Sequence, residues 1–590
     1  MGNLPMRRCL RLVQRLMFAA FCIFSIFLHS QTSSSAGAQP QDDSSKPPFT
    51  LKTATHLVLV DVVATDGKGK LVTDLKAEDF AVAEDGHPQS IRSFSFQQRA
   101  DSNEGSQTAV APLPPEVVTN IPRYKKSGIW NVIVLDALNS PMLDQSNTRQ
   151  QLLKVIDKIP NQPAAIYILS DRLHLLQDFS TDPAALKQVI AGLTNKGSVL
   201  VDNAKGGHEA ERYSPIFWAS IPESARQGIL RYESEGTASH TRNRLQITLD
   251  ALTALAQSLK SLPGRKNLIW VSEGFPFSIE PGATVDARES VTHRNYTVSI
   301  SSTANALFDS QIAIYPIDSR GIVTSDVYDP ASRGYDPLGR GQSQVGLTST
   351  VSEENNNLDV VHSSMQEIAE RTGGKAFYNR NEIGDAIIES MDDGNTYYTL
   401  AYSPSNHQWN GKFRRISVKS RRPGVKLRYR LGYFAIPPGE NRSPQEQAAA
   451  FAQAMDISSP VSTAILFKAR VIPPSEKTKN QVVVNYLVPA AGLSFEEGAD
   501  KLQHASVNCS VEVFSSNGEL VKKEGTNLIA ALQPDIYEKV VREGFPCQEK
   551  FTVPPGEYTL RLGVRDNATG LIGTADTKLV TSGLPLQEKR

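Results

Sequence analysis

The sequence has few of the residue patterns on which most enzyme sites are built. Its 590 residues include 4 Cys and 10 His. It contains no phosphate-binding Walker loop, no G-x-S-x-G nucleophile elbow, no H-E-x-x-H zinc motif and no C-x-x-C pair. The histidines between residues 128 and 394 show no metal-ligand spacing; they include His174, His208, His240 and His362. Because no nucleophile stands with a base, we expect the protein not to be an enzyme.

An excess of charge of one sign is also missing. Lys plus Arg and Asp plus Glu number 62 each. Nucleic-acid and anionic-membrane binders usually carry a basic excess, so we expect neither as a partner. The basic stretch "RRISVKSRRPGVKLRYR" has the alternation of a strand, which puts its charges on one solvated face. The length of the chain exceeds what one hydrophobic core supports, so several domains are expected.

Residues 1–38 have the features of a secretory signal peptide. Four arginines precede an apolar run over residues 16–28, which is too short to span a bilayer comfortably. Ala36-Gly37-Ala38 then precedes Gln39, as at a cleavage site. We predict a mature protein that begins at Gln39, has no membrane insertion, and is secreted, periplasmic or displayed on the cell surface. The alternative is an uncleaved amino-terminal anchor.

Removal of the signal peptide leaves two cysteines, Cys509 and Cys547. In an oxidising compartment an isolated pair in one domain indicates a disulfide. Two buried free thiols are the alternative.

The hydrophobic pattern changes several times along the chain. From residue 128, continuous apolar runs such as "IWNVIVLD" alternate with helical patterns, which predicts a doubly wound, mainly parallel α/β sheet. Short alternating strands before and after it are expected to form one β-sandwich into which the α/β domain is inserted. The expected parts are a linker at 39–50, β strands at 51–97, a linker at 98–127, the α/β domain at 128–394, β strands at 395–436, a linker helix at 437–459, and an immunoglobulin-like β-sandwich at 460–585.

Several stretches resemble a known family. "VIVLDALNSP", "GRKNLIWVSEGFP", "IYPIDSRG" and "IAERTGGKAF" occur in this order and resemble a von Willebrand factor A domain. Over about residues 50–436 the chain is similar to secreted bacterial VWFA-related proteins of the acidobacterial type. The resemblance implies the fold of the α/β domain, and it implies no biochemical activity.

The resemblance also implies a divalent-metal site. Such domains often hold Mg²⁺ or Mn²⁺ at the carboxyl end of the first strand, through Asp-x-Ser-x-Ser and a later Thr and Asp. Here Leu138 stands where the first Ser is expected, so the site is degenerate. The matching positions are Asp136, Ser140, Thr241 (preferred over Thr237) and Glu273, which follows Ser272.

A site that lacks one hydroxyl and has a longer acid suits Mg²⁺ poorly. We therefore expect one divalent cation at most, with Ca²⁺ or Mn²⁺ binding at least as well as Mg²⁺, and no other cofactor. Parallel central strands would bring Asp136, Ser140 and Glu273 to one edge of the sheet. In the alternative interpretation, Asp136 only ends a strand, while Asn139 and Ser140 cap a helix that begins near Gln145.

Two functions remain compatible with these features. The first is an exported protein-binding or adhesion module, whose protein ligand the sequence does not identify. Two long polar insertions, 196–241 and 321–359, would then select the partner. The second is a structural or assembly protein of the cell envelope with a non-functional metal site.

Overall fold

The chain has a mixed α/β fold with several sheets. The computed structural model describes residues 57–98, 114, 116–122, 129–159, 162–194, 220–275, 290–322, 344–436, 444–475, 478 and 481–581. The expected signal peptide, cleavage site and first linker lie outside these residues. Within them, no helix is long and apolar enough to cross a membrane.

A five-stranded sheet forms the middle of the structure, in the order β10-β9-β6-β7-β8. The strands are β6 (Ile129–Asp136), β7 (Ala164–Leu169), β8 (Leu173–Ser180), β9 (Arg265–Ser272) and β10 (Ile312–Asp318). The first four in spatial order are parallel, and β8 is antiparallel to β7. All eight residues of β6 and of β9 are buried, which explains the apolar runs Val132–Leu135 and Leu268–Val271 within them.

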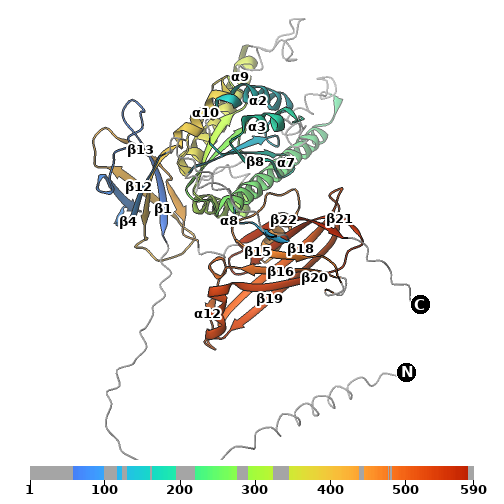
Figure 1. The fold of residues 1–590 in the computed structure, drawn as a ribbon. Helices are drawn as coiled ribbons and strands as arrows, with labels where there is room; N and C mark the ends of the chain where they lie inside the picture. The colour runs from blue at the N-terminus through green and yellow to red at the C-terminus, as the bar shows by residue number, and fades with distance from the viewer. Residues whose placement is uncertain are drawn as a thin grey trace, which may run out of the picture. The chain divides into compact units, whose positions relative to one another are not determined.

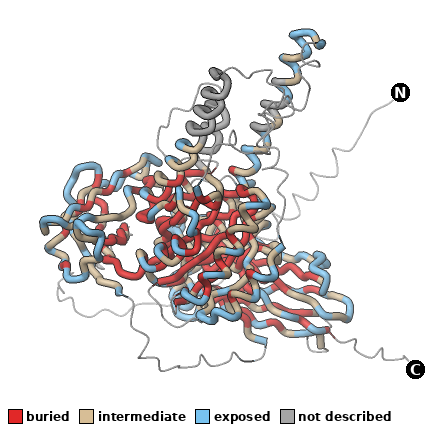
Figure 2. The backbone as a smooth tube through the Cα atoms, turned by 90° about the horizontal axis from the view of Figure 1, so that it is seen from above, coloured by how far each residue is buried: buried red, intermediate tan, exposed pale blue. Residues whose placement is uncertain are grey.

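Helices cover both faces of this sheet (Figure 1). They are α2 (Met142–Val155), α3 (Pro183–Ala191), α7 (Glu223–Leu259), α8 (Ser290–Asp309), α9 (Gln344–Thr372) and α10 (Ile383–Asp393). Trp130, Val132 and Val134 of β6 share a core with α7, α8 and α9. Ile133 and Leu135 point the other way and share a core with α2, α3 and α10. The buried residues of both cores are red in Figure 2.

Segments from both sides of the α/β part build two further sheets. Their orders are β13-β1-β11-β4 and β14-β12-β2-β3. β1 pairs antiparallel with β11, and β2 with β12, so strands far apart in the sequence are neighbours. The strands are β1 (Val58–Thr65), β2 (Phe80–Glu84), β3 (His87–Gln89), β4 (Ile91–Gln98), β11 (Thr396–Tyr402), β12 (Phe413–Ser420), β13 (Lys426–Tyr429) and β14 (Gly432–Phe434).

The amino-terminal ends of β9 and β10 meet β1 and β11 through buried polar groups. The backbone N–H of Arg265 donates to the hydroxyl of Tyr397 at 2.9 Å. The carboxylate of Asp61 accepts hydrogen bonds from the amide of Gln311 and the hydroxyl of Thr399. The amino edge of the five-stranded sheet, where its parallel strands begin, is thus occupied by contacts with these two sheets. We call the two sheets, formed by β1–β4 and β11–β14, the β part.

The carboxy-terminal part has two sheets, one ordered β20-β16-β15-β5 and one β17-β18-β21-β22 with β19 paired to β18. A disulfide joins Cys509 of β18 to Cys547 of β20 across them, with a Cα–Cα distance of 6.7 Å. This confirms the predicted pairing. The elements are β5 (Val117–Thr119), α11 (Pro444–Met455), β15 (Lys468–Ile472), β16 (Val482–Val488), β17 (Glu496–Glu497), β18 (Gln503–Ser515), β19 (Leu520–Leu532), α12 (Pro534–Glu543), β20 (Phe545–Phe551), β21 (Gly556–Asp566) and β22 (Ile572–Thr581).

Three features differ from the sequence analysis. The expected linker 98–127 contains β5, whose three residues pair with β15. β8 is not among the strands expected from continuous apolar runs, because most of its residues are only partly buried or exposed. The described parts of both insertions are largely helical, since α7 already begins at Glu223 and α9 at Gln344.

Candidate functional site

Three parallel neighbours end in polar residues at the carboxyl edge of the five-stranded sheet. β6 ends at Asp136, β9 at Ser272 and β10 at Asp318, and β9 lies between the other two. The hydroxyl of Ser272 lies 2.9 Å from Oδ2 of Asp136. The backbone N–H of Glu273 donates to the hydroxyl of Ser140 at 3.1 Å. The structure therefore brings the β6 and β9 ends together, as parallel pairing requires.

The carboxylate of Asp136 is buried and surrounded by donors. Oδ1 accepts the backbone N–H of Asn139 at 2.9 Å. Oδ2 accepts the side-chain amide of Asn139 and the indole N–H of Trp270, each at 2.9 Å. Burial raises the pKa of Asp136, and the hydrogen bonds from Asn139, Trp270 and Ser272 oppose this rise. The acid therefore organises the loop after β6 by accepting hydrogen bonds.

Asn139 and Ser140 do not cap the following helix. Helix α2 begins at Met142 after Pro141, without a side-chain hydrogen bond at its cap. The side chain of Asn139 turns back to Asp136, and Ser140 contacts the loop after β9. Ser140 thus joins the ends of β6 and β9, whereas Asn139 links the end of β6 to α7.

Thr241 lies on the exposed side of α7. The threonine that reaches the site is Thr248, whose hydroxyl lies 3.3 Å from the amide nitrogen of Asn139. The difference arises because α7 starts well before Thr241, so the residue that faces the site lies seven positions further along the same helix. Thr248 is buried and also donates to the carbonyl of Arg244.

Two arginines that no sequence motif indicated supply positive charge at this edge. Nε of Arg244 donates to Oδ1 of Asn139 at 2.8 Å. Burial lowers the pKa of Arg244, and the charges of Asp136 and Glu273 oppose that effect. Nη1 of Arg320 lies 3.7 Å from Oε1 of Glu273. Because these two guanidinium groups lie near Asp136 and Glu273, they balance negative charge that a metal cation would otherwise neutralise.

Asp318 forms a second buried cluster beside the first. It accepts hydrogen bonds from Nε and Nη2 of Arg320 at 2.9 and 2.8 Å, and lies 2.9 Å from Nε2 of His362. The ring of His362 stacks on Tyr378 with centroids 4.4 Å apart. Burial alone would lower the pKa of Arg320, but its pairing with Asp318 outweighs this and raises it. Arg320 thus links the ends of β9 and β10.

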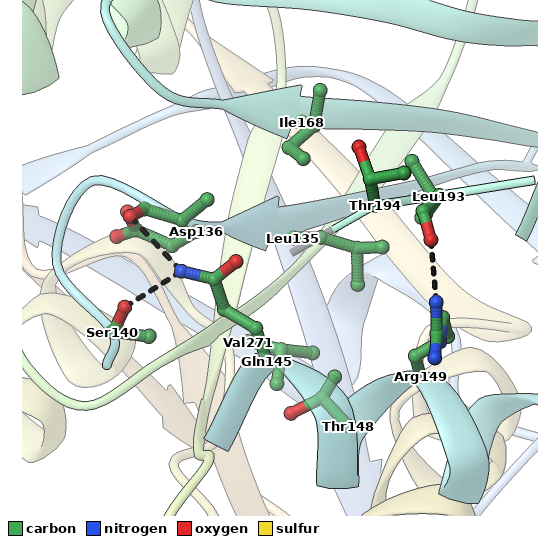
Figure 3. A pocket seen from close by; sticks show the side chains of 11 residues that line it. Leu135, Asp136, Ser140, Gln145, Thr148, Arg149, Ile168, Leu193, Thr194 and Val271 are labelled. Carbon is green, nitrogen blue, oxygen red and sulfur yellow. Dashed lines mark hydrogen bonds between the residues drawn. The ribbon is translucent and has the colours of Figure 1, made fainter. Parts of the chain in front are cut away.

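A small cavity lies next to Asp136 and Ser140 (Figure 3). Its volume is about 30 Å³, which is close to the space of one water molecule. The amide of Gln145 donates to the carbonyl of Ser140 at 2.8 Å beside it. The hydroxyl of Thr148, which also lines the cavity, is buried without a hydrogen-bond partner among the described residues. The cavity is too small for an organic ligand.

The residues at this edge fit a divalent ion poorly. Three of the four groups that contact the Asp136 carboxylate are N–H donors, which cannot ligate a cation: the backbone N–H and side-chain NH₂ of Asn139 and the indole of Trp270. Within the described part of the chain, no group of three or more His, Cys, Asp or Glu is placed to hold a metal. Ion binding at Asp136, Ser140, Thr241 and Glu273 therefore stays a prediction.

We expect Ca²⁺ or Mn²⁺ to raise the melting temperature weakly, and at least as much as Mg²⁺. Arg320→Ala should enlarge this ion-dependent shift, because it removes a cation that pairs with Glu273. Asp136→Asn should abolish the shift, since the amide carries no charge and is a poorer ligand. Thermal-shift titration of the three ions against these variants measures the effect. No ion-dependent shift in the wild type or in Arg320→Ala would rule out the site.

Comparisons with known proteins give a coarse likeness. No protein-family model matches the chain, and no match is found among curated proteins. Similar solved structures include an aerotolerance-related membrane protein from Bacteroides fragilis (12% identity, 45% of this chain, 99% of that chain, TM-score 0.21). A von Willebrand factor type A protein from Catenulispora acidiphila is similar at 10% identity, over 65% of this chain and 80% of that chain, with a TM-score of 0.19. The pilus adhesin SpaC from Lactobacillus rhamnosus GG is similar at 9% identity, over 84% of this chain and 58% of that chain, with a TM-score of 0.24. At these TM-scores the likeness assigns neither family nor function.

Proposed function

We propose that the protein is an exported protein-binding or adhesion module whose partner docks on the carboxyl edge of the five-stranded sheet. The α/β part would be a von Willebrand factor A-like domain with a degenerate divalent-metal site, and the carboxy-terminal part an immunoglobulin-like sandwich. The strand order with helices on both faces supports the first assignment. Two disulfide-linked sheets support the second.

The observation that carries the proposal is the difference between the two edges of the sheet. The amino edge is filled by contacts of Arg265 and Gln311 with the β part. The carboxyl edge gathers acids from the ends of three strands and arginines from α7 and from the loop after β10. Glu273 is 24% exposed in its side chain and pairs with Arg320, whereas Asp318 is fully buried. Glu273 and Arg320 thus offer charge to a partner on a scaffold held rigid by buried hydrogen bonds.

The proposal predicts that Glu273→Lys weakens partner binding by about tenfold or more. The substitution reverses the charge that Glu273 presents to the partner, so a group that pairs with the carboxylate would be repelled by the ammonium. Crosslinking and affinity capture from envelope and culture-medium fractions of the native host measure binding by the mature chain. Glu519→Lys makes the same change at an exposed position beyond β18, and we expect it to retain the captured protein. Equal capture by both variants would contradict docking at this edge.

The second candidate is a structural or assembly protein of the envelope. The buried polar contacts between the β part and the amino edge of the five-stranded sheet favour this function. Hydrogen bonds such as that between Arg265 and Tyr397 hold the two parts of the chain together. In that case the chain should stay with envelope fractions whether or not Glu273 is changed. Fractionation of the same variants therefore separates the two functions.

A further inference from the structure

A cavity of about 500 Å³ lies where the α/β part, the β part and the carboxy-terminal part meet. Its walls come from α7, α8, the start of β1, the region of β14, and the turn between β21 and β22. This volume is within the range of known small-molecule sites, about 300–1,000 Å³. The cavity is distant in the fold from the carboxyl-edge site, because none of its lining residues belongs to the ends of β6, β9 or β10.

Arg430 is the most informative residue of this cavity. Its guanidinium carbon lies 5.3 Å from the centre of the Phe308 ring, which fixes one face of the group. Its Nε is buried and has no hydrogen-bond partner within the described residues. An arginine remains charged in proteins, so an unpaired buried N–H calls for an acceptor, preferably an anionic one. Burial lowers the pKa of Arg430, while the charge of Asp309 opposes this.

The rest of the lining fits an anion with an apolar body. Lys260, which directly follows α7, adds a second cation, and its ammonium group has no hydrogen bond or ion pair within the described residues. Asp309 is the one acid among the lining residues, so the cations outnumber it. The apolar surface comes from Phe308, Trp409, Phe434 and Leu571.

We propose that this cavity binds a small organic carboxylate with an aromatic or aliphatic body. The carboxylate would accept hydrogen bonds from Arg430, with Lys260 contributing charge, and the body would lie against Phe308 and Trp409. Planar carboxylates match the fork of guanidinium donors, which gives the site its preference for this class. The inference is independent of the proposed protein-binding function, because it concerns other residues.

Titration calorimetry with 2-naphthoate, 3-phenylpropionate and octanoate tests the proposal. At least one acid should bind saturably at micromolar to millimolar concentration, and its neutral amide should bind about tenfold more weakly or not at all. Absence of binding by all three acids at millimolar concentration, or equal affinity for acid and amide, would overturn the proposal.

Variants locate the binding. Arg430→Met should lower the affinity for the carboxylic acid by about tenfold or more. Ala306→Phe should abolish binding by filling the cavity that Ala306 lines, whereas Ala225→Phe, at an exposed position of α7, should leave it unchanged. If Arg430→Met fails to fold, Lys260→Met and Ala306→Phe test the location instead, and both should weaken binding of the acid. Undiminished binding in Ala306→Phe would refute this cavity as the site.

Discussion

Lys266→Met is expected to stabilise the α/β part by up to about 3 kcal/mol at pH 7. Lys266 is 1% exposed at the amino end of β9. Burial lowers its pKa from 10.5 to about 8, and the charge of Asp61 only partly opposes this. Holding the ammonium charged in the fold therefore costs free energy, and methionine has a similar shape without the charge.

The titration of Lys266 should also make the free energy of unfolding depend on pH. Between pH 8 and 10.5 the unfolded chain retains a proton on Lys266 that the folded chain has lost. The free energy of unfolding should therefore rise with pH from about 8 to 10, and the unfavourable contribution is fully present below pH 8. Above pH 10 the buried tyrosines reverse the trend, because burial raises the pKa of Tyr315 to about 12.

Denaturant unfolding followed by the fluorescence of the buried Trp130 and Trp270 measures both effects. Lys266→Met should remove the rise between pH 8 and 10. Lys412→Met is a matched control, since residue 412 is exposed. A destabilised Lys266→Met protein, or one with the wild-type pH profile, would show that the fold tolerates the charge at no cost.

Arg414→Met should have the opposite sign and a larger effect, about 3–5 kcal/mol of destabilisation. Arg414 and Glu84 each expose 2% of their side chains, and Nη1 lies 3.3 Å from Oε1. Oε2 of Glu84 accepts the hydroxyls of Tyr402 and Tyr433 at 2.7 and 3.0 Å. Without the guanidinium, the carboxylate would remain buried with no cation to balance it.

Hydrogen exchange of peptides from β2 and β12 measures the loss, because Glu84 and Arg414 lie on these paired strands. Arg415→Met changes an exposed neighbour and should alter protection little, by at most about 0.5 kcal/mol. The double variant Glu84→Leu/Arg414→Met should be more stable than Arg414→Met alone, since it removes the unpaired charge. A double variant with no such recovery would mean that packing, not charge, explains the loss.

The sequence predicted best where both faces of a strand are buried. The runs at β6 and β9 indicated central parallel strands, and that pairing puts Asp136 next to Ser272. It predicted poorly where distant contacts decide the structure. Nothing local distinguishes Thr248 from Thr241 as the threonine near Asn139, because the choice depends on where α7 begins. β5 is likewise a strand only because β15 provides its partner.

Arg244 and Arg320 were missed for a related reason. No motif singles out either residue, and only the fold brings Arg244 to Asn139 and Arg320 to Glu273. "IYPIDSRG" did contain a signal, since Asp318 and Arg320 are two residues apart at the end of an apolar run. That spacing allows a local ion pair, which the structure forms through two hydrogen bonds.

The pairing of β1 with β11 has a consequence for synthesis. A nascent chain emerges from the ribosome amino end first, so Val58–Thr65 appears long before its partner Thr396–Tyr402. Until then, an apolar strand with unpaired backbone groups must be kept from aggregating. In an exported chain this interval overlaps with translocation, which requires an unfolded polypeptide. Under the proposed export, the late arrival of β11 would delay the completion of the β part and keep the chain unfolded for translocation.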